Sequence, residues 1–402
     1  MPHEVRLPGE NPTLGFAIDS AAREGEEIRV SSTEFTSSGD GEIFVSRLEG
    51  LAQELLSALP QGARVEPSQV DHLVGIYRKD MTATVYLNEC DIRAQVRSAR
   101  PFGAREPLGE DDMVDVAKVA FVVRETEEEI VFPPDAGVVA VFSYGWRKGI
   151  FFDLAPLREG VGERDYDVAG RLGSCMAYLM NAEIASMDTE TWDFMIGRGW
   201  FPFIGLPRRI SRNLVGFARS RIDLDVVLPE VVEAVGAAVP RFREAWEQAE
   251  LFGPHRDLLL RALERFEAGD YMSCTALVHS RIEGILRSIH EALGGTGNPK
   301  QRVLARTGTA GRRSSLHENS WLLPDGFGRF LEEAYFANFE PGKPATLSRN
   351  SVGHGVASQE EFGEKGACLS LLIVHQLFFY LPETEVVEEP APGADGAPAG
   401  ED

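Results

Sequence analysis

Cysteine is scarce in this chain of 402 residues, and its placement excludes two common frameworks. The four cysteines, Cys90, Cys175, Cys274 and Cys368, lie far apart and form no Cys-x-x-Cys pair. This spacing predicts neither a disulfide scaffold nor a zinc site, and it suits free, buried thiols in a reducing compartment. We therefore expect a cytoplasmic protein without a bound metal ion.

Long apolar runs and phosphate-binding motifs are missing as well. The longest strongly apolar run, residues 367–381, has 15 residues and is too short to cross a bilayer. Residues 1–6 lack the basic start and apolar centre of a signal peptide. There is no G-x-G-x-x-G, no G-K-[ST] loop and no G-x-S-x-G turn, so an enzyme in the N-terminal half, our third hypothesis, has no motif behind it. We expect no membrane contact and no cofactor.

Short apolar segments separated by charged turns dominate residues 1–160. They predict a mixed, mainly antiparallel α/β region of unknown role, for which a sensor function is one hypothesis. Strands are expected at residues 14–18, 28–30, 73–77, 82–87, 119–123, 138–142 and 150–154, and a helix at 43–59.

Helical periodicity dominates after residue 160. Residues 161–250 are predicted to form a helical connecting region and residues 251–381 an all-α bundle, which makes the fold class α+β. Residues 382–402 are rich in proline, glutamate, alanine and glycine and predict a disordered acidic tail. Helices are expected at residues 166–187, 229–251, 254–268, 271–293 and 327–339.

The net charge of −23 is unusual for a protein that binds nucleic acid, but the charge is unevenly distributed. Residues 1–250 carry −16 and the tail −7, whereas residues 251–381 are neutral. Residues 293–316 contain no acidic side chain, and we expect a loop that could follow a phosphate backbone. A solvated loop without that role is the alternative. The candidate RNA-binding residues of this loop are Lys300, Arg302, Arg306, Arg312 and Arg313.

One short stretch, Arg349-Asn350-Ser351-Val352-Gly353-His354-Gly355, has a spacing that suggests chemistry. An arginine is permanently cationic and binds phosphate oxygens through paired N–H groups, and a histidine exchanges a proton near neutral pH. Held at one phosphodiester, the two side chains could cleave RNA without a metal ion. The imidazole would relay the proton of the ribose 2′-hydroxyl, and the guanidinium would stabilise the charge that develops at phosphorus.

The same spacing recurs from Arg312 to His317, so the context of the first motif has to decide. Ser358 and Glu361 form a capping-box pattern ahead of an apolar helix expected at residues 362–381. The arginine-histidine motif is thus predicted to lie on an irregular turn that a buried helix anchors.

With this motif, residues 251–381 resemble a HEPN domain. HEPN domains are small helical bundles whose ribonuclease members carry an arginine, a polar residue and, after four to six intervening positions, a histidine. Here Asn350 is the polar residue, and the trailing Gly355 is also typical. The resemblance implies a homodimer formed through the bundle, with a composite site of two arginines and two histidines. It also implies cleavage of RNA that leaves a 2′,3′-cyclic phosphate.

The resemblance further implies roles for single residues. His354 is the proton-transfer residue, Arg349 the phosphate clamp and Asn350 a positioning group. HEPN nucleases commonly place an acidic or polar residue of the second helix near the histidine, and Glu283 is the candidate to orient His354. A surface ion pair of Glu283 with Arg287 is the alternative.

Glu283 and Arg287 belong to a polar stripe on the helix expected at residues 271–293. His279 and His290 lie on the same stripe, four and three positions from these residues. We interpret both histidines as exposed or partly packed.

The leading hypothesis is a metal-independent endoribonuclease, acting as a toxin or as an effector in phage defence or stress, with an unidentified regulatory partner. The second hypothesis is a non-catalytic HEPN module that binds RNA, a nucleotide or a protein while the N-terminal region acts as a sensor. In a purely structural alternative, Arg349 pairs with a carboxylate such as Glu360 or Glu364, and His354 caps a helix.

Overall fold

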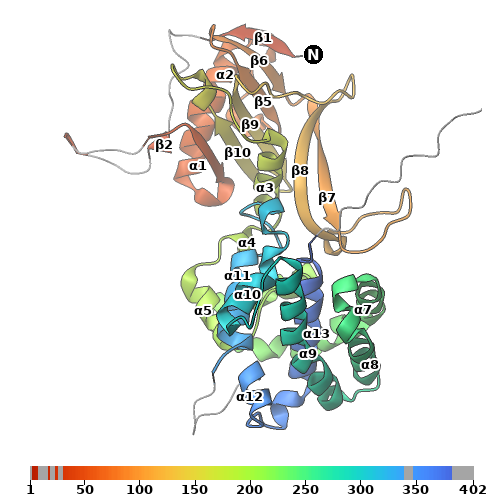
Figure 1. Ribbon diagram of the computed structural model, residues 1–402. Helices are drawn as coiled ribbons and strands as arrows, with labels where there is room; N and C mark the ends of the chain where they lie inside the picture. Colours follow the sequence, from red (N-terminus) through yellow and green to blue (C-terminus); the bar gives the residue numbers. More distant parts are fainter. Residues whose placement is uncertain (1, 8–16, 19–22, 26–29, 339–346, 383–402) are drawn as a thin grey trace, which may run out of the picture.

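The computed structural model describes residues 2–7, 17–18, 23–25, 30–338 and 347–382. An antiparallel sheet with a few helices forms the N-terminal part, and helices form the rest (Figure 1). This arrangement confirms the predicted α+β class. The predicted acidic tail, from residue 383 onward, lies outside the described residues, as do most of the strands expected at 14–18 and 28–30.

The main sheet has the strand order β1-β6-β5-β9-β10-β4, and each neighbouring pair is antiparallel. Four of these strands were expected from apolar or alternating segments, and the two edge strands, β1 and β4, were not. The strands are β1 (His3–Arg6), β4 (Thr33–Ser37), β5 (Leu73–Tyr77), β6 (Thr82–Leu87), β9 (Gly137–Tyr144) and β10 (Arg147–Asp153).

Helices cover both faces of this sheet. On one face lie α1 (Glu42–Arg47), a π-helical turn (Leu48–Ala52) and α2 (Gln53–Ala58), which together fulfil the helix expected at 43–59. The close approach needs a glycine, because a Cβ at Gly75 of β5 would lie 2.5 Å from Leu55 Cδ1. On the other face lies α3 (Val168–Met180).

A separate two-stranded ribbon, β7 (Cys90–Ser98) and β8 (Met113–Val123), leaves the sheet and reaches the helical part (Figure 1). Helix α3 packs along β8 so closely that a Cβ at Gly173 would lie 2.7 Å from the Ala117 carbonyl oxygen. A short pair, β2 (Ala17–Ile18) and β3 (Val30–Ser31), stands apart from both sheets. Strand β8 of the ribbon contacts the helical part, because the Met113 carbonyl accepts from Arg208 Nη2 at 2.8 Å and the Val116 carbonyl lies 2.8 Å from His317 Nε2.

The helices expected at 166–187, 229–251, 254–268 and 271–293 are present, the first of them split into α3 and α4. The helix expected at 327–339 begins earlier, as α11, and continues as a π-helical turn, Leu331–Tyr335. The helices of the described part after α3 are α4 (Ala182–Ala185), α5 (Thr189–Gly197), α6 (Arg208–Arg219), α7 (Leu228–Gln248), α8 (Arg256–Glu267), α9 (Tyr271–Ala292), α10 (Gln301–Ala310), α11 (Pro324–Phe330), α12 (Arg349–Gly353) and α13 (Glu364–Phe378).

Two local expectations are wrong. Residues 293–316, expected to be a loop, contain helix α10, whose Leu304 and Ala305 are buried. The expected capping box at Ser358 does not start the last helix. A 3-10 turn spans Glu360–Phe362, and α13 follows with Gly363 as its N-cap.

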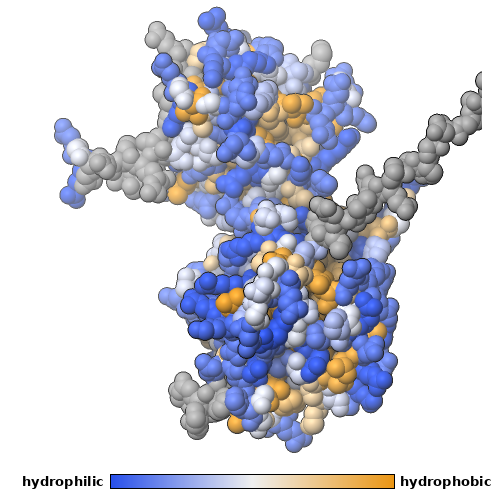
Figure 2. Space-filling model, viewed as in Figure 1, coloured by the Kyte–Doolittle hydropathy of each residue, from blue (hydrophilic) through white to orange (hydrophobic). Residues whose placement is uncertain are grey.

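One hydrophobic core extends from a face of the sheet, through α3 and β8, into the helices. At its far end α7 packs against α13, where the rings of Phe242 and His375 lie 4.2 Å apart. Polar residues cover most of the face of the molecule seen in Figure 2. Within the described ranges, no helix has the length and apolar character needed to span a membrane.

Candidate functional site

The arginine-histidine motif lies on a short helix rather than on the irregular turn that we expected. Ser348 caps α12: its hydroxyl accepts from the Ser351 backbone N–H, and the Ser351 hydroxyl accepts from the Ser348 backbone N–H. Arg349 is the first residue of this helix, and His354 is its C-cap. Gly355 follows with φ +69°, a conformation that favours glycine and ends the helix.

Asn350 points into the protein and is buried. Its side-chain amide nitrogen lies within hydrogen-bond distance of the carbonyl oxygens of Phe336 (3.1 Å) and Ala337 (3.2 Å), and of Asn338 Oδ1 (3.0 Å). Its Oδ1 accepts from Gln301 Nε2 at 2.9 Å. The polar residue of the motif therefore joins α12 to the end of the π-helical turn and to the start of α10.

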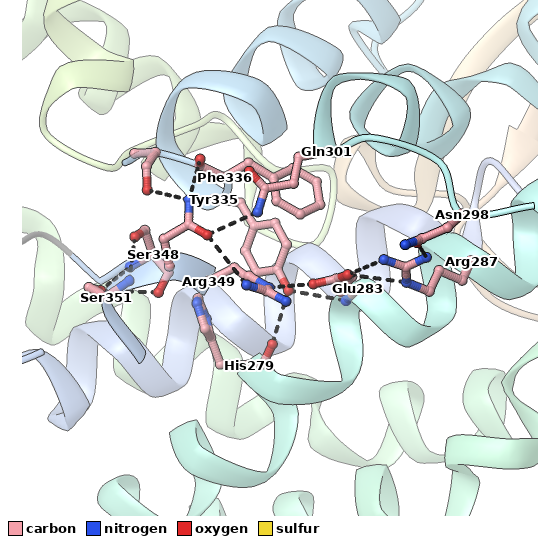
Figure 3. A network of polar contacts seen from close by, with 12 residues as sticks. His279, Glu283, Arg287, Asn298, Gln301, Tyr335, Phe336, Ser348, Arg349 and Ser351 are labelled. Atoms are coloured by element: carbon pink, nitrogen blue, oxygen red, sulfur yellow. Dashed lines mark hydrogen bonds and ion pairs between the residues drawn. The ribbon is translucent and has the colours of Figure 1, made fainter. Parts of the chain in front are cut away.

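The guanidinium of Arg349 lies between Glu283 and the end of its own helix. Its Nε donates to Glu283 Oε2, and Figure 3 shows the side chain pointing toward that carboxylate. Its Nη1 would lie 3.7 Å from a Cβ at Gly353, the residue before His354. The Arg349 side chain is 39% exposed, so this cation, although paired, stays accessible to solvent.

Glu283 of α9 is held by two arginines. It accepts from Arg349 and, at 2.6 and 3.1 Å, from Arg287, while its own side chain is only 13% exposed. Burial would raise the pKa of Glu283, but the hydrogen bonds from Arg287 and Arg349 outweigh burial and lower it. The Tyr335 hydroxyl fixes this turn of α9, since it accepts from the Glu283 N–H and donates to the His279 carbonyl, each at 3.1 Å.

This arrangement alters the expected role of Glu283. The sequence suggested that it orients His354 or pairs with Arg287 on the surface. The structure shows it pairing with Arg287 and also holding Arg349. Arg349 thus has a carboxylate partner, as in the structural alternative, although it is neither Glu360 nor Glu364, and His354 is a helix C-cap, as that alternative also expected. The His354 side chain is exposed, and the backbone N–H of this residue donates to the Asn350 carbonyl at 3.0 Å.

His279 is buried, contrary to its expected place on an exposed or partly packed stripe. Its ring lies 5.0 Å from that of Tyr335, and its Nδ1 lies 3.2 Å from the Ser370 hydroxyl of α13. Burial lowers the pKa of His279 to about 4, so this histidine is neutral at physiological pH. His290 is half-buried beside Thr307.

Two residues of the site were not expected from the sequence. Tyr335 and Gln301 each bridge elements that are far apart in the chain, α9 to the π-helical turn and α10 to α12. Neither belongs to a motif, and only the folded chain brings them to Glu283 and Asn350.

The five predicted RNA-binding residues are spread along and beyond α10. Arg302 pairs with Glu332 at 3.1 Å, Arg313 pairs with Asp325, and Arg312 Nε donates to the Leu381 carbonyl at 2.9 Å. Lys300 and Arg306 are exposed. Lys300 adjoins Gln301 and so lies at the end of α10 nearest Arg349, whereas Arg312 and Arg313 lie beyond the other end, roughly 15 Å away along the helix.

No family model, curated protein or solved structure matches this chain. The described residues contain no cluster of histidine, cysteine and carboxylate side chains that could hold a metal ion.

Proposed function

We propose that the chain is a metal-independent endoribonuclease of the HEPN type, with its site at α12. One observation carries the proposal: the Arg349 guanidinium lies against Gly353, next in sequence to the solvent-exposed His354. Arg349 Nη1 thus lies near the C-terminal end of this five-residue helix, where His354 is the C-cap, and the proposal requires the imidazole to face the same end. A phosphodiester at that end would be within reach of both.

Each residue then has a chemical role. His354 takes the proton of the ribose 2′-hydroxyl, and the oxygen attacks phosphorus and displaces the 5′-oxygen of the next nucleotide. That leaving oxygen takes a proton from a histidine, either the same one or His354 of a second copy. Arg349 stabilises the charge on the phosphoryl oxygens. The products are a 2′,3′-cyclic phosphate and a 5′-hydroxyl, and DNA resists because it lacks the 2′-hydroxyl.

Glu283 and Asn350 act as positioning residues in this scheme. Glu283 holds the Nε edge of Arg349, and Asn350 Oδ1 accepts from its Nη1 at 3.4 Å, which leaves Nη2 for a phosphate. Because Arg287 pairs with the same carboxylate, the cluster of two arginines and one glutamate keeps a net positive charge. Lys300 adjoins the site and would contact the neighbouring phosphate.

The cellular setting is also a proposal. A homodimer through the helical bundle would bring two copies of Arg349 and His354 to one RNA strand. A sensor role of the N-terminal sheet and a regulatory partner would fit a toxin or a defence effector in the cytoplasm.

The test is cleavage of total RNA by the purified chain in the presence of EDTA. We expect fragments with cyclic phosphate ends from the wild type and none from His354→Ala. Arg349→Lys, which keeps the charge but loses the fork, should be about 10²-fold slower. His290→Ala is the matched control, since this histidine lies outside the site, and it should cleave normally. Equal cleavage by wild type and His354→Ala, or cleavage that EDTA stops, refutes the proposal.

A second candidate is a non-catalytic module that binds RNA, a nucleotide or a protein. The ion pair between Arg349 and Glu283 favours it, because a site that binds its ligand without cleaving it would also need the arginine to be held in place. RNA that is retained by the chain but stays intact in the same assay would support it.

A further inference from the structure

A groove lies where the ribbon of β7 and β8 meets the helical part, and its volume is about 590 Å³. The base of the ribbon, where β7 ends and β8 begins, forms one wall. The C-terminal ends of α7, α9 and α13 form the other. Binding sites occur preferentially at junctions of this kind. The lining residues that matter most are Arg97, Leu251, Arg312, Leu322, Phe378 and Phe379.

Apolar side chains make up much of this groove. Leu322 and Phe379 are buried, whereas Leu251 and Phe378 are only half-buried, although all four belong to the hydrophobic core or pack against it. Apolar groups of an occupant would remove the remaining surface of Leu251 and Phe378 from water. The groove therefore favours an occupant that is partly apolar.

The charged residues of the groove are mostly basic. Arg97, near the end of β7, and Arg312, after α10, are both half-buried, and among the described lining residues Glu250 is the one carboxylate beside them. Arg312 is held in place, because its Nε donates to the Leu381 carbonyl at 2.9 Å. The groove is thus locally positive in a chain whose net charge is −23, and an acidic occupant complements it.

The chain itself leads into the groove. Leu381 and Pro382 line it, and they pack tightly, since a Cβ at Gly311 would lie 3.0 Å from Pro382 Cδ. The next seven residues are Glu383-Thr384-Glu385-Val386-Val387-Glu388-Glu389, which combine carboxylates with two adjacent valines. Seven extended residues reach about 23 Å, or roughly twice the diameter of a helix. This segment is long enough to pass from the end of α13 to the ribbon.

A segment that is tethered at the edge of the groove has an advantage over a separate partner. A short flexible connection gives the tethered groups an effective concentration on the order of millimolar at the site. Contacts that are too weak to hold a free acidic peptide therefore suffice for a segment of the same chain.

We propose that residues 383–389 of this chain dock in the groove and act as a strap between the ribbon and the helices. The carboxylates of Glu383 and Glu385 pair with the two arginines, and the two valines cover the half-buried leucine and phenylalanine. The strap ties the end of β7 to the end of α13. It is separate from the α12 site and does not depend on RNA cleavage.

The test is disulfide trapping in the full chain with two engineered cysteines, Ser98→Cys and Val386→Cys. Ser98 is exposed and lines the groove, and the four natural cysteines are buried. The equilibrium with glutathione gives the effective concentration of one thiol at the other. We expect a value at least ten-fold higher than for Gln95→Cys with Val386→Cys. Gln95 is the matched control site, because it is exposed on the same strand but does not line the groove.

Removal of the two carboxylates should release the strap. Glu383→Gln together with Glu385→Gln should lower the effective concentration of the Ser98 pair at least five-fold. Glu401→Gln together with Asp402→Asn removes the same charge further along the chain and should leave it unchanged. The proposal is overturned if both engineered pairs are trapped equally or if loss of the first two carboxylates has no effect. It is also overturned if the disulfide joins two copies of the chain, because the occupant would then belong to a second copy.

Discussion

Asn350 is expected to matter first for stability, and exchanging its amide for a carboxylate isolates that effect. Asn350→Asp keeps the shape of the side chain but replaces the N–H donors with an acceptor. The carbonyl oxygens of Phe336 and Ala337, at 3.1 and 3.2 Å, would then face a carboxylate instead of a donor. Each buried group left unpaired costs about 1–3 kcal/mol, so we expect a total loss of about 2–4 kcal/mol for Asn350→Ala and more for Asn350→Asp.

The measurement is the denaturant midpoint of the unfolding transition, followed by circular dichroism at several pH values. The pKa of the introduced carboxyl would be raised in the folded chain, so its destabilisation should shrink as the pH falls and the protonated acid donates again. Asn298→Asp is the matched control, because the Asn298 Oδ1 accepts from Arg287 on an exposed surface and a carboxylate serves there equally well. If Asn350→Asp unfolds at the wild-type midpoint at neutral pH, the inward role of Asn350 is wrong.

Three further predictions concern the same region. Gly353→Leu should displace the Arg349 guanidinium, whose Nη1 lies 3.7 Å from the Cβ position. RNA cleavage should slow at least ten-fold, with little change in the melting temperature. Unchanged cleavage would show that the guanidinium has no part in the reaction. Gly355→Ala should cost about 1 kcal/mol in denaturant unfolding, because φ is +69°, and a neutral result would refute that strain. Burial lowers the pKa of His279 to about 4, so the unfolded chain binds a proton that the folded chain excludes between that value and 6.5. The free energy of unfolding should therefore fall as the pH falls through this range. His279→Gln should reduce the slope of this free energy against pH. His375, which is buried with its pKa also lowered, should account for the slope that remains.

The strands and helices that bury a regular apolar pattern could be predicted from the sequence. β5 and β6 begin and end at the expected residues, because a continuous apolar run marks β5 and a partly alternating segment marks β6. The edge strand β4 was missed, since its sequence Thr-Glu-Phe-Thr-Ser is mostly polar and its pairing with β10 defines it. Edge strands of this kind depend on a partner that local patterns do not reveal.

Helix α10 shows the opposite case, in which tertiary packing overrides local preference. Two threonines and a glycine in its second half favour a loop. The glycine is needed because a Cβ at Gly308 would lie 2.8 Å from Leu331 and 2.9 Å from Leu286. The close packing of α10 between α9 and the π-helical turn thus explains both the glycine in its sequence and why this segment is helical.

The candidate site could be predicted as a set of residues but not as an arrangement. The spacing within α12 singled out Arg349, Asn350 and His354, and the stripe on α9 singled out Glu283. The contact between Glu283 and Arg349 arises only when α9 and α12 pack together, and no local pattern encodes it. The burial of His279 has the same origin, because α13 and Tyr335 cover that part of the stripe.

The packing of α7 against α13 decides how this protein can be handled at the bench. A fragment that starts at residue 251 would omit α7 and leave the apolar side of α13 around His375 in contact with water, where Phe242 now shields it. Such a fragment should aggregate, and a measurement of its oligomeric state would not describe the intact chain. Biochemical work on the arginine and histidine of α12 is therefore best done on the intact polypeptide.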